Sequence, residues 1–184
     1  MDGVTDLFAQ NLSSLTRYHR NLAEKLLGTS PDPDFHVTTS NTGTPVPVFR
    51  GDASPLYLNS KYDPAREAKR FVESSRSARS YLLLGIDAGF TLKELLRREE
   101  TELIVIVDYD LRYLRFLFEH FDFVSPLLDP RVALLINPVK PLETLLNTYI
   151  PLFHGDLAVL SVRARERMNE GFFERPFRVG QLGQ

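Results

Sequence analysis

The residues whose types and spacing could do chemistry lie in the turn Gly85–Gly89 and at Asp108. The turn follows the apolar run Tyr81–Gly85, and Asp108 follows the apolar run Leu103–Val107. Both runs are continuous rather than alternating, which is typical of strands buried on both faces of a parallel sheet. The amphipathic segment Thr91–Arg98 lies between the turn and the second run. This order is the layout of a nucleotide-binding βαβ unit, in which an acidic residue follows the second strand.

The turn is similar to motif I of S-adenosylmethionine-dependent methyltransferases, which needs glycines at three alternate positions. Those positions hold Gly85, Asp87 and Gly89 here. An aspartate at the middle position would repel a phosphate, although it could pair with an ammonium or sulfonium group. Asp108 could accept hydrogen bonds from ribose hydroxyls. We therefore predict these four residues as binding residues for a nucleotide-type ligand, either S-adenosylmethionine-like or a nucleotide sugar. The alternative is a degenerate turn that is kept for packing between helix and strand.

The elements that must position this turn alternate between strand and helix. The expected elements after Asp108 are a helix at Leu111–Phe121, a strand at Val132–Ile136, a helix at Leu142–Tyr149 and a strand at Leu157–Val162. Such alternation predicts parallel strands joined by right-handed crossovers. We therefore expect an α/β fold, with a Rossmann-like, mostly parallel sheet similar to that of methyltransferases. The charged and aromatic residues from Arg165 onward could form a further helix.

A small lobe of one helix and a β-hairpin is expected before this sheet. Its elements are a helix at Leu7–Leu27 and strands at Phe35–Thr39, Val46–Arg50 and Leu56–Leu58. The apolar residues of the helix recur at helical spacing, and Ser40–Thr44 is rich in residues that favour hairpin loops. We therefore divide the chain into an N-terminal lobe at 1–60 and a Rossmann-like domain at 61–184.

A helix with a basic surface is expected to connect the two parts. Asp63 is a natural N-cap, and Pro64 suits the first helical position because a missing N–H costs nothing there. Four basic side chains near this helix could bind a phosphate or carboxylate. They are Lys61, Arg66, Lys69 and Arg70. The alternative is a solvated charged face, partly neutralised by Glu67 and Glu73.

Two phrases of the sequence resemble the N-terminal region of the Maf family. These motility-associated factors are bacterial proteins implicated in glycosylating flagellin. The first phrase, SKYDPxREAxR, is matched by Ser60, Lys61, Tyr62, Asp63, Pro64, Arg66, Glu67, Ala68 and Arg70. The second phrase is matched by Gly85 and Gly89, and Asp108 matches the acidic end of the next strand. The resemblance extends from about residue 8 to residue 140.

The resemblance implies an N-terminal Rossmann-like domain that belongs to a longer protein. Transfer of a nonulosonic acid sugar is assigned in the family to a central domain of sialyltransferase-like fold, which would begin near Gln184. The resemblance therefore implies a non-catalytic domain, in a truncated or a short protein, that positions a C-terminal transferase domain or flagellin. Two alternatives remain: a methyltransferase-like domain that binds S-adenosylmethionine, and a dimerisation module that uses the apolar face Phe8–Leu26.

Composition and motifs exclude several other classes of function. The net charge of −2 does not indicate a nucleic acid or an anionic membrane as partner, and the absence of cysteine removes disulfides and zinc–thiolate sites. The four histidines lack metal-binding spacing, and no serine lies in a nucleophile elbow. We expect a cytoplasmic protein because the N-terminus is acidic and no apolar run could span a membrane. No catalytic residue and no metal ligand is predicted.

Overall fold

The computed structural model describes residues 6–51, 54–138, 144, 147–148 and 156–173. Its main sheet has four parallel strands in the order β6-β5-β4-β7. They are β4 (Ser80–Leu84), β5 (Leu103–Asp108), β6 (Val132–Ile136) and β7 (Leu157–Ser161). After β4 the chain adds β5 and β6 on one side of it, and then crosses over to place β7 on the other side. This is the order of the first four strands of a Rossmann fold. The predicted α/β fold class is confirmed.

Strands β4 and β5, at the centre of this sheet, are apolar because both of their faces are buried. All five residues of β4 are buried, and five of the six residues of β5 are buried. One face carries Leu83 and Ile106 into the larger core, and the other carries Leu82 and Val107 into a second apolar cluster that includes Phe173. The continuous apolar runs of the sequence follow from this two-sided burial.

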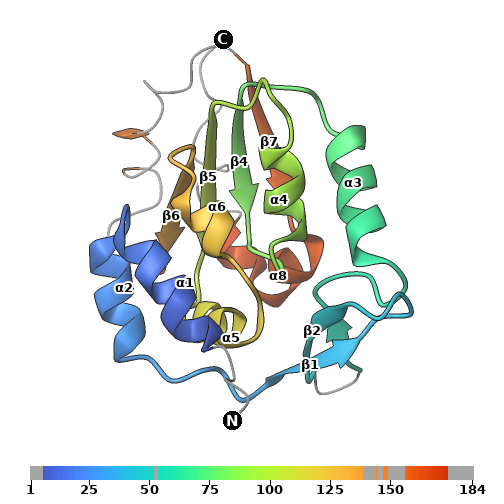
Figure 1. Cartoon of the computed structure of the whole chain (residues 1–184). Coiled ribbons are helices and arrows are strands. Elements are labelled where there is room, and N and C mark those ends of the chain that lie inside the picture. Colours follow the sequence, from blue (N-terminus) through green and yellow to red (C-terminus); the bar gives the residue numbers. More distant parts are fainter. Residues whose placement is uncertain (1–5, 52–53, 139–143, 145–146, 149–155, 174–184) are drawn as a thin grey trace.

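Helices cover the sheet and connect its strands. The helices that follow the hairpin lobe are α3 (Pro64–Ser74), α4 (Phe90–Leu96), α5 (Leu111–His120), α6 (Val124–Leu128) and α8 (Arg163–Met168). Figure 1 shows α4 and α6 in front of the sheet, with α3 on one flank. The short helix α6 was not predicted from the sequence, whereas α8 overlaps the further helix expected from Arg165 onward. The helix expected at Leu142–Tyr149 lies almost entirely outside the described residues.

The expectation of one helix over Leu7–Leu27 is wrong, because the chain forms α1 (Leu7–Thr16) and α2 (Arg20–Leu27). The backbone leaves the helical region at His19, whose φ is −134°. The imidazole of His19 lies 3.4 Å from the carbonyl oxygen of Val132, at the start of β6. This long-range contact and the packing of both helices beside α5 override the helical pattern of the sequence.

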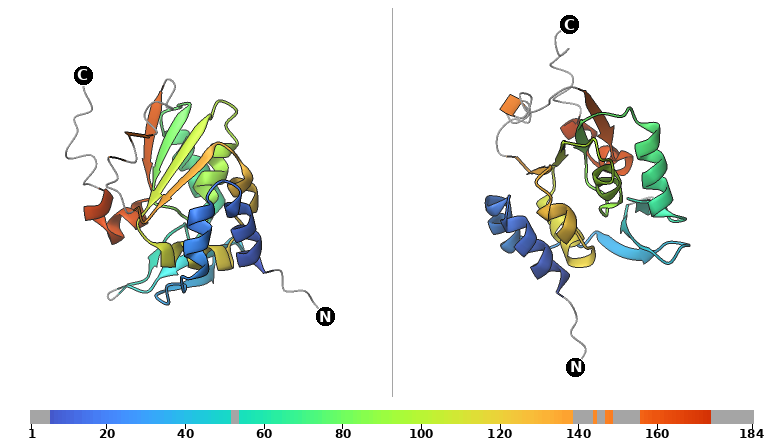
Figure 2. Two further views of the ribbon diagram at one scale, coloured as in Figure 1. Left: turned by 90° about the vertical axis from the view of Figure 1, so that its left-hand side faces the viewer. Right: turned by 45° about the horizontal axis from the view of Figure 1, so that its top comes forward.

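A buried asparagine holds α1 against the end of α5. Its side chain donates hydrogen bonds from Nδ2 to the carbonyl oxygens of Phe118 and Phe121, at 3.0 and 2.7 Å. The backbone N–H of Phe123 donates to Oδ1 of the same residue, Asn11, at 2.8 Å. Figure 2 shows α1 and α2 side by side against the rest of the fold. The amide thus satisfies backbone groups that the end of α5 leaves unpaired.

The predicted hairpin is confirmed and belongs to a three-stranded antiparallel sheet. Its strands are β1 (Phe35–Thr39), β2 (Pro45–Phe49) and β3 (Leu56–Tyr57). The ring of Phe35 lies 4.6 Å from the ring of Tyr113 on α5, and Leu58 belongs to the same core cluster. The lobe and the main sheet therefore share one apolar core, and a division at residue 60 stays a prediction.

None of the helices that the structure describes has the length and apolar character needed to cross a membrane.

Candidate functional site

The glycine turn between β4 and α4 adopts a backbone that favours glycine. The φ angles are +84° at Gly85 and +91° at Gly89, in the left-handed region that residues with a Cβ rarely adopt. The side chain of Asp108, at the end of β5, accepts a hydrogen bond from the N–H of Ile86 at 3.0 Å. The structure therefore brings Gly85, Asp87, Gly89 and Asp108 together at the carboxyl edge of the sheet, as predicted.

Asp87, which occupies the middle position of the turn, points into the protein. The residue is 3% exposed, and its carboxylate accepts hydrogen bonds from Gly89 N at 2.8 Å and from Thr91 N and Oγ1 at 3.2 and 2.7 Å. Asn59 Nδ2 donates to it at 3.1 Å, while Asn59 Oδ1 accepts from the N–H of Ala88. Asp87 therefore caps the start of α4 and ties the turn to the segment after β3.

Asp108 forms a buried bidentate ion pair with Arg165 of α8. The Nη2–Oδ1 distance is 2.6 Å and the Nε–Oδ2 distance is 3.0 Å, and neither side chain is more than 1% exposed. The N–H of Tyr109 also donates to Asp108 Oδ1, at 2.7 Å. The carboxylate that would accept ribose hydroxyls in a nucleotide-binding fold is thus already saturated by the protein itself. A ribose could reach Asp108 only after Arg165 had moved.

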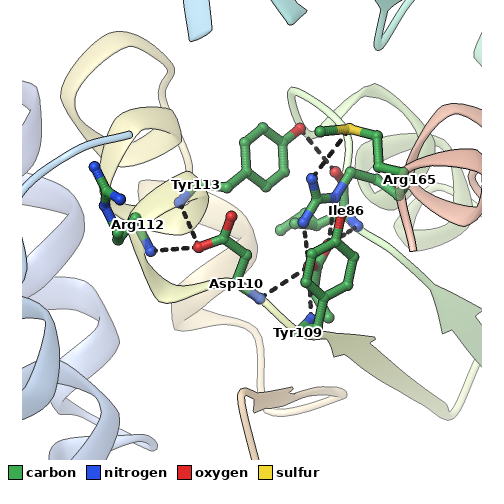
Figure 3. A network of polar contacts seen from close by, with 8 residues as sticks. Ile86, Tyr109, Asp110, Arg112, Tyr113 and Arg165 are labelled. Carbon is green, nitrogen blue, oxygen red and sulfur yellow. Dashed lines mark hydrogen bonds and ion pairs between the residues drawn. The ribbon is translucent and has the colours of Figure 1, made fainter. Parts of the chain in front are cut away.

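Two tyrosine rings enclose the guanidinium of Arg165 (Figure 3). Its Cζ atom lies 4.3 Å from the ring centre of Tyr109 and 4.0 Å from that of Tyr113. The hydroxyl of Tyr113 donates to the carbonyl oxygen of Ile86 at 2.9 Å, which fixes the ring beside the turn. Cation–π contacts of this kind are strong where the cation is desolvated.

The pKa values of Arg165 and of the two tyrosines depart from their ordinary values. Burial lowers the pKa of Arg165, but the carboxylate of Asp108 outweighs it and holds the pKa above its ordinary value. Burial raises the pKa of Tyr109 to about 12, although the Arg165 cation opposes the rise. Burial also raises the pKa of Tyr113 well above its ordinary value. Both phenols therefore stay neutral, and Arg165 stays protonated, over the physiological pH range.

The space beside the two glycines is filled by side chains of the same chain. A Cβ at Gly85 would lie 2.6 Å from the Cβ of Arg165 and 3.3 Å from the Cβ of Val162. A Cβ at Gly89 would lie 3.1 Å from the ring of Phe123. In a dinucleotide-binding turn, glycines also allow the backbone to approach a pyrophosphate. The geometry favours the packing interpretation of the turn, and binding of a ligand by these residues stays a prediction.

The predicted anion-binding residues lie on the solvent side of α3 and in the loop just before it. Lys61, Arg66, Lys69 and Arg70 are all exposed. Lys69 Nζ lies 3.8 Å from Glu73 Oε1, and Lys61 Nζ lies 5.2 Å from the ring centre of Tyr62. The helix itself begins as predicted, because Asp63 Oδ1 accepts from the N–H of Arg66 at 2.9 Å. An anion-binding role for these residues stays a prediction.

A pocket of about 420 Å³ lies against the opposite face of α3. Its walls come from the end of the hairpin lobe, α3, the glycine turn and the segment from β7 into α8. The lining residues are Leu56, Tyr57, Leu58, Asn59, Glu67, Ala68, Phe71, Asp87, Thr91, Ser161, Val162, Arg163, Ala164 and Arg167. Of the predicted site residues, only Asp87 contributes to this pocket.

Asp110, the second carboxylate after β5, caps α5. Its Oδ1 accepts hydrogen bonds from the N–H groups of Arg112 and Tyr113, at 2.8 and 3.2 Å. This is the capping role that the sequence suggests for an aspartate just before a helix. Within the part of the chain that the structure describes, no three acidic or histidine side chains are close enough to hold a metal ion.

Sequence reasoning missed the two residues that complete the turn. Arg165 lies 57 positions after Asp108, and Asn59 lies 28 positions before Asp87. The available signal for Arg165 was its place just after the fourth apolar strand, because the carboxyl ends of parallel strands share one edge. No local pattern marks Asn59.

Comparison with known proteins supports the fold. No family model matches the sequence, and no curated protein matches it either. The structure is similar to that of a Maf glycosyltransferase from Magnetospirillum magneticum AMB-1, with a TM-score of 0.58 and 16% identity. The similarity covers 96% of this chain and 36% of that protein, so this chain spans well under half of its length. At this identity the likeness establishes the fold alone, and at that level it confirms the resemblance to a Maf protein.

Two spermidine synthase structures are more distantly similar. The enzyme from Thermotoga maritima has a TM-score of 0.43 at 14% identity, covering 67% of this chain and 46% of that one. A spermidine synthase in complex with the transition state analogue AdoDATO has a TM-score of 0.39 at 13% identity, covering 77% and 51%. These scores are too low to support an inference about function.

Proposed function

We propose that this chain is the non-catalytic, Rossmann-like N-terminal domain of a Maf-type glycosyltransferase-like protein. Its role is to position a C-terminal transferase domain or the flagellin acceptor, while the transferase domain transfers a nonulosonic acid sugar. The observation that carries the proposal is the buried Asp108–Arg165 pair, which fills the place where this fold would hold a ribose.

The remaining contacts of the turn support a scaffolding role. The carboxylate of Asp87 accepts hydrogen bonds from the turn and from α4, and the ring of Phe123 packs on Gly89. A turn built for catalysis would leave polar groups directed at a ligand. The likeness to a Maf glycosyltransferase over 36% of its length fits one domain of a larger protein.

A binding experiment tests the positioning role. We expect the purified chain to bind immobilised flagellin, or a separately produced transferase domain from the same organism, in biolayer interferometry. An unrelated protein of similar net charge serves as the control. The chain alone is expected to transfer no sugar from a cytidine-monophosphate-linked nonulosonic acid to flagellin, as followed by intact-protein mass spectrometry.

Two outcomes would contradict the proposal. Sugar transfer by the chain alone would make it a catalytic domain. Failure to bind both flagellin and the transferase domain would remove the positioning role. Methyl transfer from S-adenosylmethionine to any partner in the same assay would support the methyltransferase-like alternative instead.

A further inference from the structure

The 420 Å³ pocket lies where an open α/β sheet usually binds its ligand. Strand order reverses at β4, so the chain leaves β4 and β7 in opposite directions and opens a crevice at their carboxyl ends. Asp87 follows β4, and Ser161 and Val162 close β7, and all three line the pocket. Its volume lies within the range of about 300–1,000 Å³ that is usual for small-molecule sites. Arg165 does not line the pocket, although Asp87 of the glycine turn does.

One side of the pocket is acidic. Glu67, on α3, is exposed and accepts the N–H of Ser60 at 2.6 Å through Oε2. Asp87 also lines the pocket, but it is buried and its carboxylate already accepts four hydrogen bonds. Packing of the Glu67 carboxyl group raises its pKa, the Ser60 N–H opposes the rise, and the charge of Asp87 adds to it. A cationic group of a ligand in the pocket would stabilise the charged form of Glu67.

The other side of the pocket is basic. Arg163 and Arg167 come from α8 and line the pocket, and their separation of four residues places them on one helix face. Both are exposed, and within the described part of the chain neither forms an ion pair. Guanidinium groups in this arrangement suit a carboxylate, which they can hold through paired hydrogen bonds.

Apolar side chains join the two charged sides. Leu58 comes from the end of the hairpin lobe, Phe71 from α3 and Val162 from the end of β7. A simple cation would meet the repulsion of the arginines, and a simple anion would meet that of the carboxylates. We propose that this pocket binds a small zwitterion, an α-amino acid or a close derivative, with its ammonium group at Glu67 and its carboxylate at Arg163 and Arg167.

Titration calorimetry on the whole chain tests the proposal. The probes are the twenty standard amino acids, each used at up to about 10 mM so that millimolar affinities are detected. We expect saturable one-to-one binding of at least one of them. The methyl ester of that amino acid lacks the carboxylate charge, and its N-acetyl form lacks the ammonium. Each is expected to bind at least about tenfold more weakly.

Variants locate the binding in this pocket. Glu67→Gln keeps the size and the acceptor for Ser60 N but removes the charge, and Arg167→Gln removes a charge from the opposite side. Each is expected to weaken binding at least about tenfold. Glu73→Gln, on the solvent side of α3, and Arg97→Gln, in the exposed pair with Glu94, are matched controls that should bind like the wild type.

Three results would overturn the proposal. They are the absence of saturable heat with all twenty amino acids, equal binding of the ester or N-acetyl form, and undiminished binding by both Glu67→Gln and Arg167→Gln. Because all four substituted residues are exposed, circular dichroism should show unchanged folding in every variant. The inference does not depend on the proposed positioning role, since neither flagellin nor a transferase domain takes part in the titration.

Discussion

Removing the charge of Asp108 is expected to destabilise the fold strongly. The substitution Asp108→Asn leaves the guanidinium of Arg165 buried between two tyrosine rings without an anionic partner. Loss of one member of a buried ion pair costs about 3–5 kcal/mol, because the remaining charge is uncompensated. Arg165→Met keeps much of the volume and leaves Asp108 with the N–H donors of Ile86 and Tyr109. Its cost is expected to be smaller, about 2–3 kcal/mol.

The double variant separates the ion pair from the packing. Once one member of the ion pair has been replaced, replacing the other breaks no further pair. The double variant should therefore be more stable than the sum of the two single costs implies, by about 1–3 kcal/mol. Urea unfolding followed by circular dichroism is the assay, since the chain contains no tryptophan. With a slope of about 2 kcal/mol/M, the Asp108→Asn cost corresponds to a midpoint lowered by about 1.5–2.5 M.

An exposed ion pair supplies the control. Glu102→Gln breaks an ion pair in which the side chains of Glu102 and Arg79 are 49% and 61% exposed. It should lower the free energy of unfolding by less than about 1 kcal/mol. The reasoning is refuted if Asp108→Asn costs no more than this control, or if the two single costs add fully in the double variant. Either result would mean that the carboxylate and the guanidinium do not depend on each other.

Three further predictions concern Gly85, Ser80 and the half-buried His19. Gly85→Ala should lower the free energy of unfolding by more than about 2 kcal/mol in the same urea assay. Gly43 has a similar positive φ but open space around it, so Gly43→Ala should cost about 1 kcal/mol. Equal costs would contradict the close approach of Arg165 to Gly85. Ser80→Ala should raise stability by about 1 kcal/mol because the buried Ser80 hydroxyl has no described hydrogen-bond partner, and a loss would contradict this. Burial lowers the pKa of His19 in the folded protein, so the unfolded chain binds a proton more readily and stability should fall as the pH drops below 6.5, the ordinary pKa of histidine. His19→Gln should reduce this loss of stability. An unchanged dependence of stability on pH would contradict the prediction.

The elements of the main sheet could be predicted because their signals are local. The continuous apolar runs of β4, β5 and β6 reflect burial on both faces, and Asp63 and Pro64 mark the start of α3. The break at His19 could not be predicted, because it depends on a carbonyl group of Val132, 113 residues away. Helix α6 was missed since its five residues are too few for a helical pattern and include Pro126.

The candidate site was predicted only in outline. The glycines and Asp108 could be located from spacing, and the structure places them together at the sheet edge. The side chains around the glycines and Asp108 come from distant parts of the sequence. Arg165 lies on α8, and Asn59 lies in the loop after β3. A carboxylate at the end of a strand has the same sequence signal whether it accepts hydrogen bonds from a ligand or from its own chain. Sequence reasoning therefore finds the turn but not the side chains that fill it.

Titration calorimetry of the wild-type chain with nucleotide ligands tests the central claim most directly. The ligands are S-adenosylmethionine, its demethylated product and a cytidine-monophosphate-linked sugar. Because Arg165 already saturates Asp108, we predict no saturable heat with any of them at concentrations up to about 1 mM. Saturable one-to-one binding that is weakened by Asp108→Ala would contradict the claim and would make the glycine turn a working nucleotide site.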